Sequence, residues 1–373
     1  MGDKSEMAGV MGNLANVVGD AGDLDLSLKL YDQELSIARE IDDRHLIAET
    51  LNNIGVIEVL QGRLTHGANH FQESIEILRD LGDIDYVAQA LDSLGGAQLL
   101  RGDVTEAINS FNEELANFQK AGDDQAVAYA SGNLGQALAM SGDLKGAEEN
   151  LNHALAMTRK SGEKHYIAEN LTALGQVHYY EARDQESRKE YEEAISIHDE
   201  MGEAYTQEET RLGLAVLDLE EGRYDEAASL TRKALSEAEK ERMRDMQLMA
   251  HTMLARILAE QHQPGLARSQ LATAERIAGG SENLAARFML AIAKAEVAQP
   301  TVSTRLRREL QAVVTEAHER SLIPAEYAAN FQLGLDEASS STSHNCSRLN
   351  ALRNETSAHG FRRIAEAASS ICH

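Results

Sequence analysis

The sequence repeats itself every 40 residues, and this period holds without an insertion across seven copies. In each copy an aliphatic residue is followed by a small one, at Leu14-Ala15, Ile54-Gly55, Leu94-Gly95, Leu134-Gly135, Leu174-Gly175, Leu214-Ala215 and Leu254-Ala255. A period of this length is typical of repeat architectures, in which each unit buries its core only against its neighbours. The period therefore predicts a solenoid rather than a set of globular domains.

Each copy also has a second small position followed, four residues later, by a residue that is usually larger. The small residues are Ser27, Gly67, Ala107, Ala147, Ser187, Ala227 and Ala267, and the residues that follow are Tyr31, Phe71, Phe111, Leu151, Tyr191, Thr231 and Leu271. Apolar positions spaced by three, four and seven lie on one face of a helix. Each copy is therefore predicted to form two helices of roughly 17 residues each.

A glycine separates the two predicted helices in most copies, at Gly22, Gly62, Gly102, Gly142 and Gly222, with Ala182 and His262 in its place elsewhere. Glycine suits the left-handed residue that ends a helix, and a following Asp can cap the next one. The small residues are predicted to mark the point where two antiparallel helices cross closely. The larger residues are predicted to fill the gap against the neighbouring repeat.

The segments "LNNIGVIEVLQGRLTHGANHFQESIEIL" and "SGNLGQALAMSGDLKGAEENLNHALAM" resemble tetratricopeptide repeats of the 40-residue kind. The resemblance implies an all-α, right-handed solenoid of helix-turn-helix repeats. Seven repeats in register fill residues 1–280, and about two degenerate helical pairs with a C-terminal cap fill 281–373. This ending resembles the tail of arrays in large bacterial signalling proteins.

Within the C-terminal part, residues 282–298 and 301–323 are predicted to form one pair of helices separated by Pro300. Residues 324–338 and 346–368 are predicted to form another, with Pro324 in a first helical turn. The Ser-rich segment 339–347 between them is predicted to be a loop.

The formal net charge of −26 lies entirely in residues 1–300, since the remaining 73 residues carry equal numbers of acidic and basic side chains. Such a surface repels nucleic acid and anionic membranes and favours a neutral or basic protein or peptide partner. Two cysteines, Cys346 and Cys372, are too few for a disulfide framework and fit a reducing compartment. With no signal peptide or membrane-spanning segment predicted, the chain is expected to be cytoplasmic.

In stacked hairpins of this type the first helices line the concave surface, and this face is the predicted partner-binding groove. Its candidate residues are Asn13, Asn53, Leu60, Leu100, Tyr129, Asn133, Gln136, Met140, Gln176 and Tyr180. Amide side chains donate and accept hydrogen bonds, so they can hold a peptide backbone, and an apolar stripe suits a bound helix or strand. Two alternatives stay open: the asparagines bond to neighbouring helices, or the leucines are buried between successive first helices.

No catalytic constellation, cofactor site or metal site is predicted. His66 and His70 lie one helical turn apart without a further ligand in the same motif, and His344, Cys346, Cys372 and His373 stand in a loop or at the chain end. The sequence thus predicts a non-catalytic scaffold or adaptor that binds a peptide or helix in the concave groove. The alternative is a ligand-sensing array of a bacterial signalling protein whose effector domain is upstream or on another chain.

Overall fold

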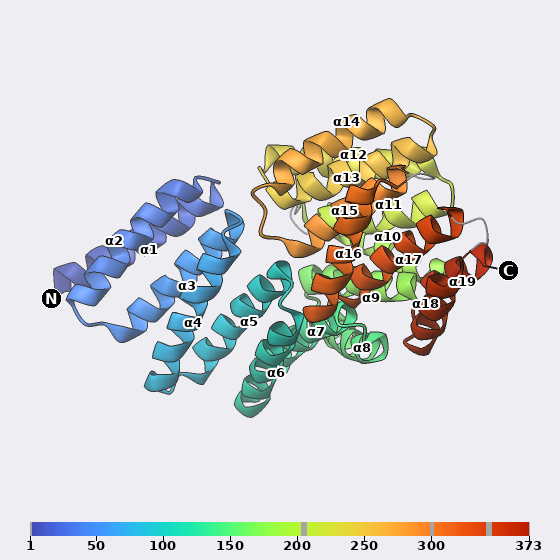
Figure 1. Cartoon of the computed structure of the whole chain (residues 1–373). Helices are drawn as coiled ribbons and strands as arrows, with labels where there is room; N and C mark the ends of the chain where they lie inside the picture. The colour runs from blue at the N-terminus through green and yellow to red at the C-terminus, as the bar shows by residue number, and fades with distance from the viewer. Residues whose placement is uncertain (1, 203–206, 299–301, 341–344, 373) are drawn as a thin grey trace. The chain divides into compact units, whose positions relative to one another are not determined.

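The structure, a computed structural model, describes residues 2–202, 207–298, 302–340 and 345–372 (Figure 1). Over these residues the chain forms nineteen α-helices joined by short turns and no β-strand. The predicted all-α architecture of consecutive helix-turn-helix repeats is confirmed. The chain divides into two compact units, Met1–Asn133 and Leu134–His373, and each is described by itself below.

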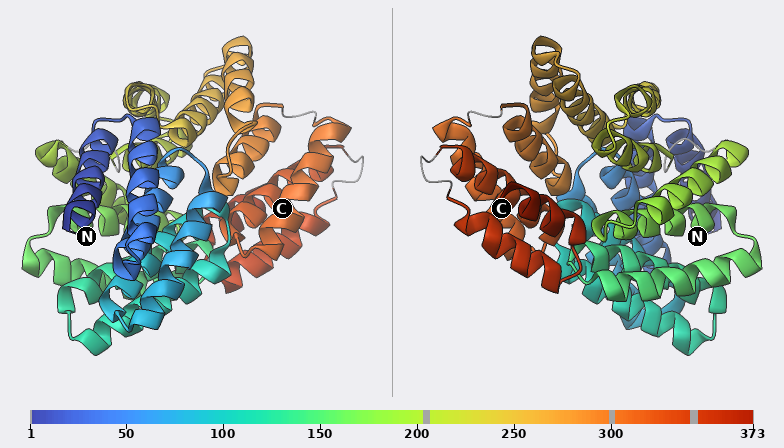
Figure 2. Two further views of the ribbon diagram at one scale, coloured as in Figure 1. Left: turned by 90° about the vertical axis from the view of Figure 1, so that its left-hand side faces the viewer. Right: turned by 90° about the vertical axis from the view of Figure 1, so that its right-hand side faces the viewer.

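The first unit contains three complete hairpins and the beginning of a fourth. Its helices are α1 (Gly2–Asp20), α2 (Leu24–Glu40), α3 (Arg44–Leu60), α4 (Leu64–Leu81), α5 (Ile84–Arg101), α6 (Val104–Ala121) and the first part of α7 (Asp124–Met140). The two views of Figure 2 show the blue helices of this unit running antiparallel to their neighbours.

The second unit continues the array and ends in shorter helices. They are α8 (Leu144–Ser161), α9 (Lys164–Tyr180), α10 (Asp184–Met201), α11 (Gln207–Glu220), α12 (Tyr224–Lys240), α13 (Arg244–Glu260), α14 (Pro264–Ala278), α15 (Leu284–Ala298), α16 (Thr304–Glu319), α17 (Ile323–Ser340), α18 (Ser347–Ala358) and α19 (Arg362–Ile371). The predicted boundary between array and cap at residue 280 stays a prediction.

The two helices of a hairpin approach most closely at the paired small residues. A methyl group added to Gly95 would lie 2.4 Å from Cε1 of Phe111, and one added to Gly55 would lie 2.6 Å from Cε1 of Phe71. Where the second small residue is serine, its hydroxyl bonds across the crossing, as from Ser187 to the carbonyl oxygen of Gly175 at 2.7 Å. The predicted crossing point is thus present in the structure.

The larger residue packs against the neighbouring repeat as predicted: Tyr31 lies in one core cluster with Leu51 and Ile54, and Phe71 lies in another with Val87 and Leu91. At Gly55, Gly95, Gly135 and Gly175 its side chain also lies over the small residue of its own hairpin. Tyr191 illustrates both contacts, because a methyl group on Gly175 of the same repeat or on Gly213 of the next would each lie within 3 Å of its ring. One aromatic ring therefore joins the hairpin crossing to the contact between repeats.

The turns are built as the glycine pattern predicts. Gly62 has φ +77°, and the following N–H of Arg63 donates to the carbonyl oxygen of Glu58 at 2.8 Å. Ala182 and His262, which replace the glycine, keep the left-handed conformation with φ 57° and 58°. These two residues hold a conformation that costs an L-residue roughly 1–2 kcal/mol.

The C-terminal segment differs from the prediction in two respects. The stretch 346–368, predicted as one helix, is broken into α18 and α19 by Gly360, which has φ +84°. In addition, Cys346 and Cys372 form a disulfide with a Cα–Cα distance of 5.9 Å, so the prediction of reduced cysteines is wrong. The break folds α19 back on α18 and brings the two sulfur atoms together. Pro324 lies in the first turn of α17, as predicted, whereas Pro300 lies outside the described residues.

The final helices also do more than cover the last apolar face of the array. Leu290 of α15 packs on Leu271 of α14 as a further repeat would. Tyr327, Leu352 and Phe361, from α17 to the start of α19, instead join the core formed by α8, α9 and α10. The C-terminal helices are therefore an integral part of the second unit.

Replacing Ala182 by glycine is expected to stabilise the chain by about 0.5–1 kcal/mol, because glycine adopts positive φ without the Cβ clash. The measurement is urea denaturation followed by circular dichroism. Gly62→Ala is the matched control, since no atom lies near the added methyl group and only the backbone conformation opposes it. A stabilised Gly62→Ala chain, or an Ala182→Gly chain less stable than the parent, would contradict this explanation of the turns.

Candidate functional site

The predicted groove residues of the first unit lie on the first helices of its hairpins and are accessible to solvent. Asn13 on α1 is exposed, and Asn53 on α3 is half-buried. Leu60 and Leu100 occupy equivalent positions at the ends of α3 and α5 and are 46% and 37% exposed. The alternative that these leucines are buried between successive first helices is therefore wrong.

Val56, one turn before Leu60, is also exposed. Val56 and Leu60 together form an apolar stripe on α3 that Leu100 continues on α5. We call these three residues the inner stripe. The polar side chains of Glu49 and Gln89 are exposed on the same helices, two to three turns before the stripe. A row of exposed apolar side chains is a feature that protein-binding surfaces share.

The amides of the predicted groove differ in what they contact. Asn133 donates a hydrogen bond of 2.6 Å to Asp92 of α5, so this asparagine joins two successive first helices. Tyr129 is half-buried and its hydroxyl accepts from Gln125 on the same helix. For Asn133 the structure thus supports the alternative of a bond to a neighbouring helix.

In the second unit the predicted residues lie on the end of α7 and on α9. Gln136 and Met140 are half-buried, and Gln176 is exposed and donates to the hydroxyl of Tyr180 at 3.0 Å. The ring of Tyr180 lies 5.3 Å, centroid to centroid, from that of Phe361. The chain's own C-terminal segment therefore covers the part of this face nearest the end of α9.

Arg363 fixes this cover in place. Its Nε donates to the carbonyl oxygen of Tyr179 at 2.8 Å, and its Nη1 donates to Glu220 at 2.6 Å. Its Nη2 contacts Asp184, and the guanidinium lies 4.3 Å above the ring of Tyr179. The guanidinium thus bonds to a residue of each of α9, α10 and α11. These contacts were not predicted, because Arg363 lies outside the repeat period.

A second kind of polar contact recurs inside the hairpins, between residues 12 apart. Glu58 bonds to His70 at 2.8 Å, Ser110 to Gln98 at 2.8 Å, and His178 to Glu190 at 2.6 Å. The residues of these pairs occupy equivalent positions in the 40-residue period. They were not predicted, although the period carried the signal: polar residues recur at positions 58, 98 and 178.

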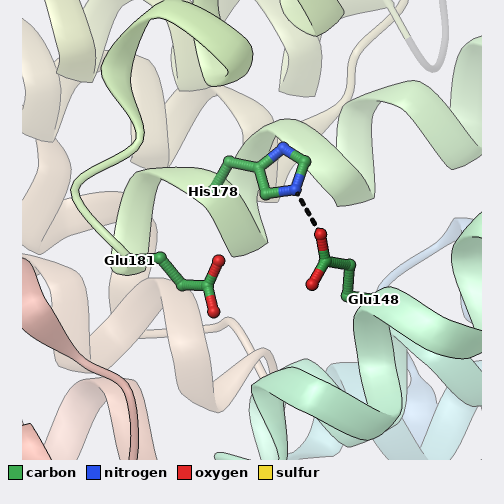
Figure 3. Close-up of side chains that lie close together, drawn as sticks. All are labelled: Glu148, His178 and Glu181. Carbon is green, nitrogen blue, oxygen red and sulfur yellow. Dashed lines mark hydrogen bonds and ion pairs between the residues drawn. The ribbon is translucent and has the colours of Figure 1, made fainter.

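His178 is also part of a cluster with Glu148 of α8 and Glu181 (Figure 3). Its Nε2 lies 3.1 Å from Glu148 and its Nδ1 lies 2.6 Å from Glu190. The Nη1 atom of Arg183 lies 2.8 Å from Glu148 and 2.9 Å from Glu181. The cluster joins the second helix of one repeat to the hairpin of the next.

The donor set of this cluster fits an ion-pair network better than a metal ion. A metal ligand needs a ring nitrogen with a free lone pair, whereas both nitrogens of His178 face carboxylates. Arg183 already provides the positive charge between Glu148 and Glu181. The equivalent positions one repeat later support this interpretation. There Asp218 stands in the place of His178 and Arg188 in that of Glu148, and Asp218 contacts Arg188 at 2.7 Å and Arg223 at 2.8 Å.

The environment of His178 shifts its titration. Burial lowers the pKa of His178, but its hydrogen bonds to Glu190 and Glu148 outweigh burial and hold the pKa above the ordinary value of 6.5. For Glu148, burial raises the pKa, and the hydrogen bonds from Arg183 and His178 outweigh it, so the pKa lies below 4.5. The charged forms of both residues are thus favoured in the folded chain.

No cation site or catalytic site was predicted at His66, His70, Cys346 or Cys372. Cys346 and Cys372 are joined to each other, which removes both thiols. His344 and His373 lie outside the described residues.

Replacing His178 by glutamine is expected to lower the free energy of unfolding by about 1–3 kcal/mol at pH 5.5, because charged hydrogen bonds are lost. A raised folded pKa gives stabilisation that is complete below the unfolded value near 6.5 and is lost as pH rises through the folded value. The difference between parent and His178→Gln should therefore shrink at pH 8.5. Urea denaturation at the two pH values measures it. A difference that stays equal or grows at pH 8.5 would show that His178 is not an imidazolium in the folded chain.

A family model described as "Tetratricopeptide repeat" matches the sequence over residues 6–80, 46–120, 86–160 and 124–200. These overlapping matches cover residues 6–200, more than half of the chain. The chain belongs to the tetratricopeptide repeat family. Solenoids of this kind build extended concave surfaces that are used for binding. No curated protein matches the sequence.

Several solved structures share the fold at low sequence identity. A Rap protein complexed with competence and sporulation factor is 12% identical, with 98% of this chain and 99% of that chain covered and a TM-score of 0.65. The Rap conjugation gene regulator of plasmid pLS20 in complex with the Phr* peptide is 15% identical, with coverage of 90% and 99% and a TM-score of 0.62.

A third similar structure belongs to a larger protein. It is the signal transduction ATPase with numerous domains, PH0952, from Pyrococcus horikoshii, which has a tetratricopeptide repeat sensor. The identity is 13% and the TM-score 0.51, over 92% of this chain and 54% of that one. At these identities the likeness concerns the fold. In the part of the chain that the structure describes, no helix is long and apolar enough to cross a membrane.

Proposed function

We propose that this tetratricopeptide array is a non-catalytic scaffold that binds a peptide or helix of a partner protein on the inner face of its first helices. The observation that carries the proposal is the inner stripe of Val56, Leu60 and Leu100. Leu60 and Leu100 are exposed at equivalent positions of two successive first helices, and Val56 is exposed one turn before Leu60. Exposed apolar residues in register favour an extended apolar ligand over a small polar one.

The polar residues around the stripe support a peptide ligand. Asn53 on α3 stands one turn before Val56 and two turns before Leu60 and is half-buried. Its amide both donates and accepts. The backbone of an extended peptide has unpaired N–H and C=O groups that such an amide can bond. A bound helix has its backbone groups paired already, so it would use the apolar stripe. The first unit is the preferred binding surface, because the C-terminal helices already cover the end of α9 in the second.

Charge favours a neutral or basic partner. The net charge of −26 attracts a basic segment and slows the approach of nucleic acid or an anionic lipid surface. Two of the proteins with a similar fold were determined with a factor or peptide bound, which agrees with a peptide ligand here. We further propose a cytoplasmic location for this interaction, in which the Cys346–Cys372 disulfide would be of a kind that is rare.

A non-catalytic role agrees with the titratable groups described above. The clusters around His178 and Asp218 are ion-pair networks whose members face one another, so they hold no base poised beside a free nucleophile. Their arrangement joins repeats and explains their presence without a reaction.

The test compares the full chain with a Leu60→Ser, Leu100→Ser variant as baits for quantitative affinity capture. Both leucines are exposed, so the variant should fold as the parent does, which circular dichroism checks. The matched control is Leu81→Ser, Ile84→Ser, which removes two equally exposed apolar side chains at a junction between repeats. The expected result is one partner retained by parent and control and reduced at least ~10-fold by the inner-stripe variant.

Two outcomes contradict the proposal. One is equal capture by the parent and the inner-stripe variant, which would place binding elsewhere on the chain. The other is equal loss in the inner-stripe and control variants, which would indicate unspecific adhesion to exposed apolar groups. For a retained partner, calorimetry on purified proteins then gives the change in affinity.

A further inference from the structure

The helix α5 contains a glycine that the packing of the repeats does not require. Gly95 and Gly96 follow each other in the interior of this helix. A methyl group on Gly95 would lie 2.4 Å from Cε1 of Phe111, so packing requires that glycine. Among the described residues, a methyl group on Gly96 would have no neighbouring side chain or helix within 4 Å. Gly96 is therefore free of the constraint that fixes Gly95.

The backbone conformation of Gly96 does not require glycine either. Its backbone is helical, whereas a turn glycine such as Gly102 has a positive φ angle. In the interior of a helix glycine is less stable than alanine, because it loses more conformational freedom on folding. Position 96 thus has a residue that lowers the stability of α5, and neither packing nor backbone geometry accounts for it.

The 40-residue period places Gly96 on the proposed binding face. It is equivalent to Val56 of the inner stripe, and Leu100 of the same stripe stands one turn after it. Where α3 has the exposed side chain of Val56, α5 has open space. We call this space the Gly96 notch. A glycine at such a point allows the backbone of a ligand to approach closely.

Polar residues lie before the Gly96 notch and apolar residues after it. Ser93 stands one turn before Gly96, and Asn53 is its equivalent on α3. The hydroxyl of Ser93 donates to the carbonyl oxygen of Gln89 at 3.4 Å and can still accept a hydrogen bond. A peptide main chain has unpaired N–H and C=O groups that Asn53 and Ser93 can bond. Its apolar side chains can contact Leu60 and Leu100.

We propose that the ligand is an extended peptide whose main chain crosses α5 at the Gly96 notch, so that Gly96 sets how closely it approaches the array. This inference rests on the proposed function and commits it to an extended peptide in place of a helix. A helix is surrounded by its own side chains, so one missing side chain on α5 does not bring its backbone closer. The notch is one residue wide, which fits a single main chain.

The test introduces Gly96→Ala into the full chain and makes two measurements. Urea denaturation should show a more stable chain, with an unfolding equilibrium constant roughly 4-fold smaller, because alanine favours the helix and its methyl group has room. The binding probe is a peptide that the parent chain selects from a random-peptide library. Calorimetry should show that Gly96→Ala binds this peptide at least ~10-fold more weakly, because the methyl group occupies the space of the main chain.

Two further variants separate this inference from the proposed function. Gly265→Ala adds a methyl group in equally open space on α14, which is a second helix, and should leave the affinity unchanged. The Leu60→Ser, Leu100→Ser variant should bind the peptide more weakly than the parent. Weaker binding by that variant together with full affinity of Gly96→Ala overturns the inference and leaves the proposed function intact. A Gly96→Ala chain less stable than the parent also overturns it, because the glycine would then serve the fold.

Failure of the proposed function gives a different result. A parent chain that selects no peptide contradicts both proposals, and so does a peptide that the parent and the Leu60→Ser, Leu100→Ser variant bind equally. NMR chemical shifts of the labelled peptide report its bound conformation. A peptide that is helical when bound overturns the inference alone.

Discussion

The fold rests on the close approach of two helices at a glycine. At Gly55, Gly95 and Gly175 the missing side chain leaves space for an aromatic ring of the antiparallel helix, and at Gly135 for Leu151. The same ring then touches the next repeat, as Tyr191 does through Gly213. The hairpin crossing and the contact between repeats are therefore made by one side chain. Because this geometry recurs every 40 residues, each hairpin places its first helix in the same setting as the one before.

That regularity gives the surface its properties. The positions that face the helix crossing are small or apolar. In several repeats a polar residue near the end of the first helix bonds to a polar residue 12 positions later, on the second helix. In Glu58–His70 the acidic residue comes first, and in His178–Glu190 the histidine comes first. Leu60 and Leu100 are exposed at the ends of α3 and α5, so burial in the core does not account for their apolar character. This agrees with the ligand-binding role proposed for them.

The sequence predicted much of the fold because the period constrains each repeat against its neighbours. It located the helices, the turns at Gly62 and its equivalents, and the crossing at Gly95. Ala182 and His262 depart from the glycine pattern, and their positive φ angles were not predicted. Among the groove residues, the sequence left open whether Leu60 and Leu100 are exposed or buried, and in the structure both are exposed.

Features outside the period could not be predicted in this way. Arg363 meets Tyr179, Asp184 and Glu220 across more than 140 residues of sequence, and no spacing rule connects them. The disulfide between Cys346 and Cys372 depends on the break at Gly360, which a continuous apolar pattern concealed.

The most direct test of the binding proposal is hydroxyl-radical footprinting of the chain, free and with its captured partner. This method reports the solvent exposure of individual side chains. The account predicts that Val56, Leu60 and Leu100 are labelled in the free chain and protected in the complex, while Leu81 and Ile84 are labelled equally in both. Unchanged labelling of Leu60 and Leu100 in the complex would contradict it.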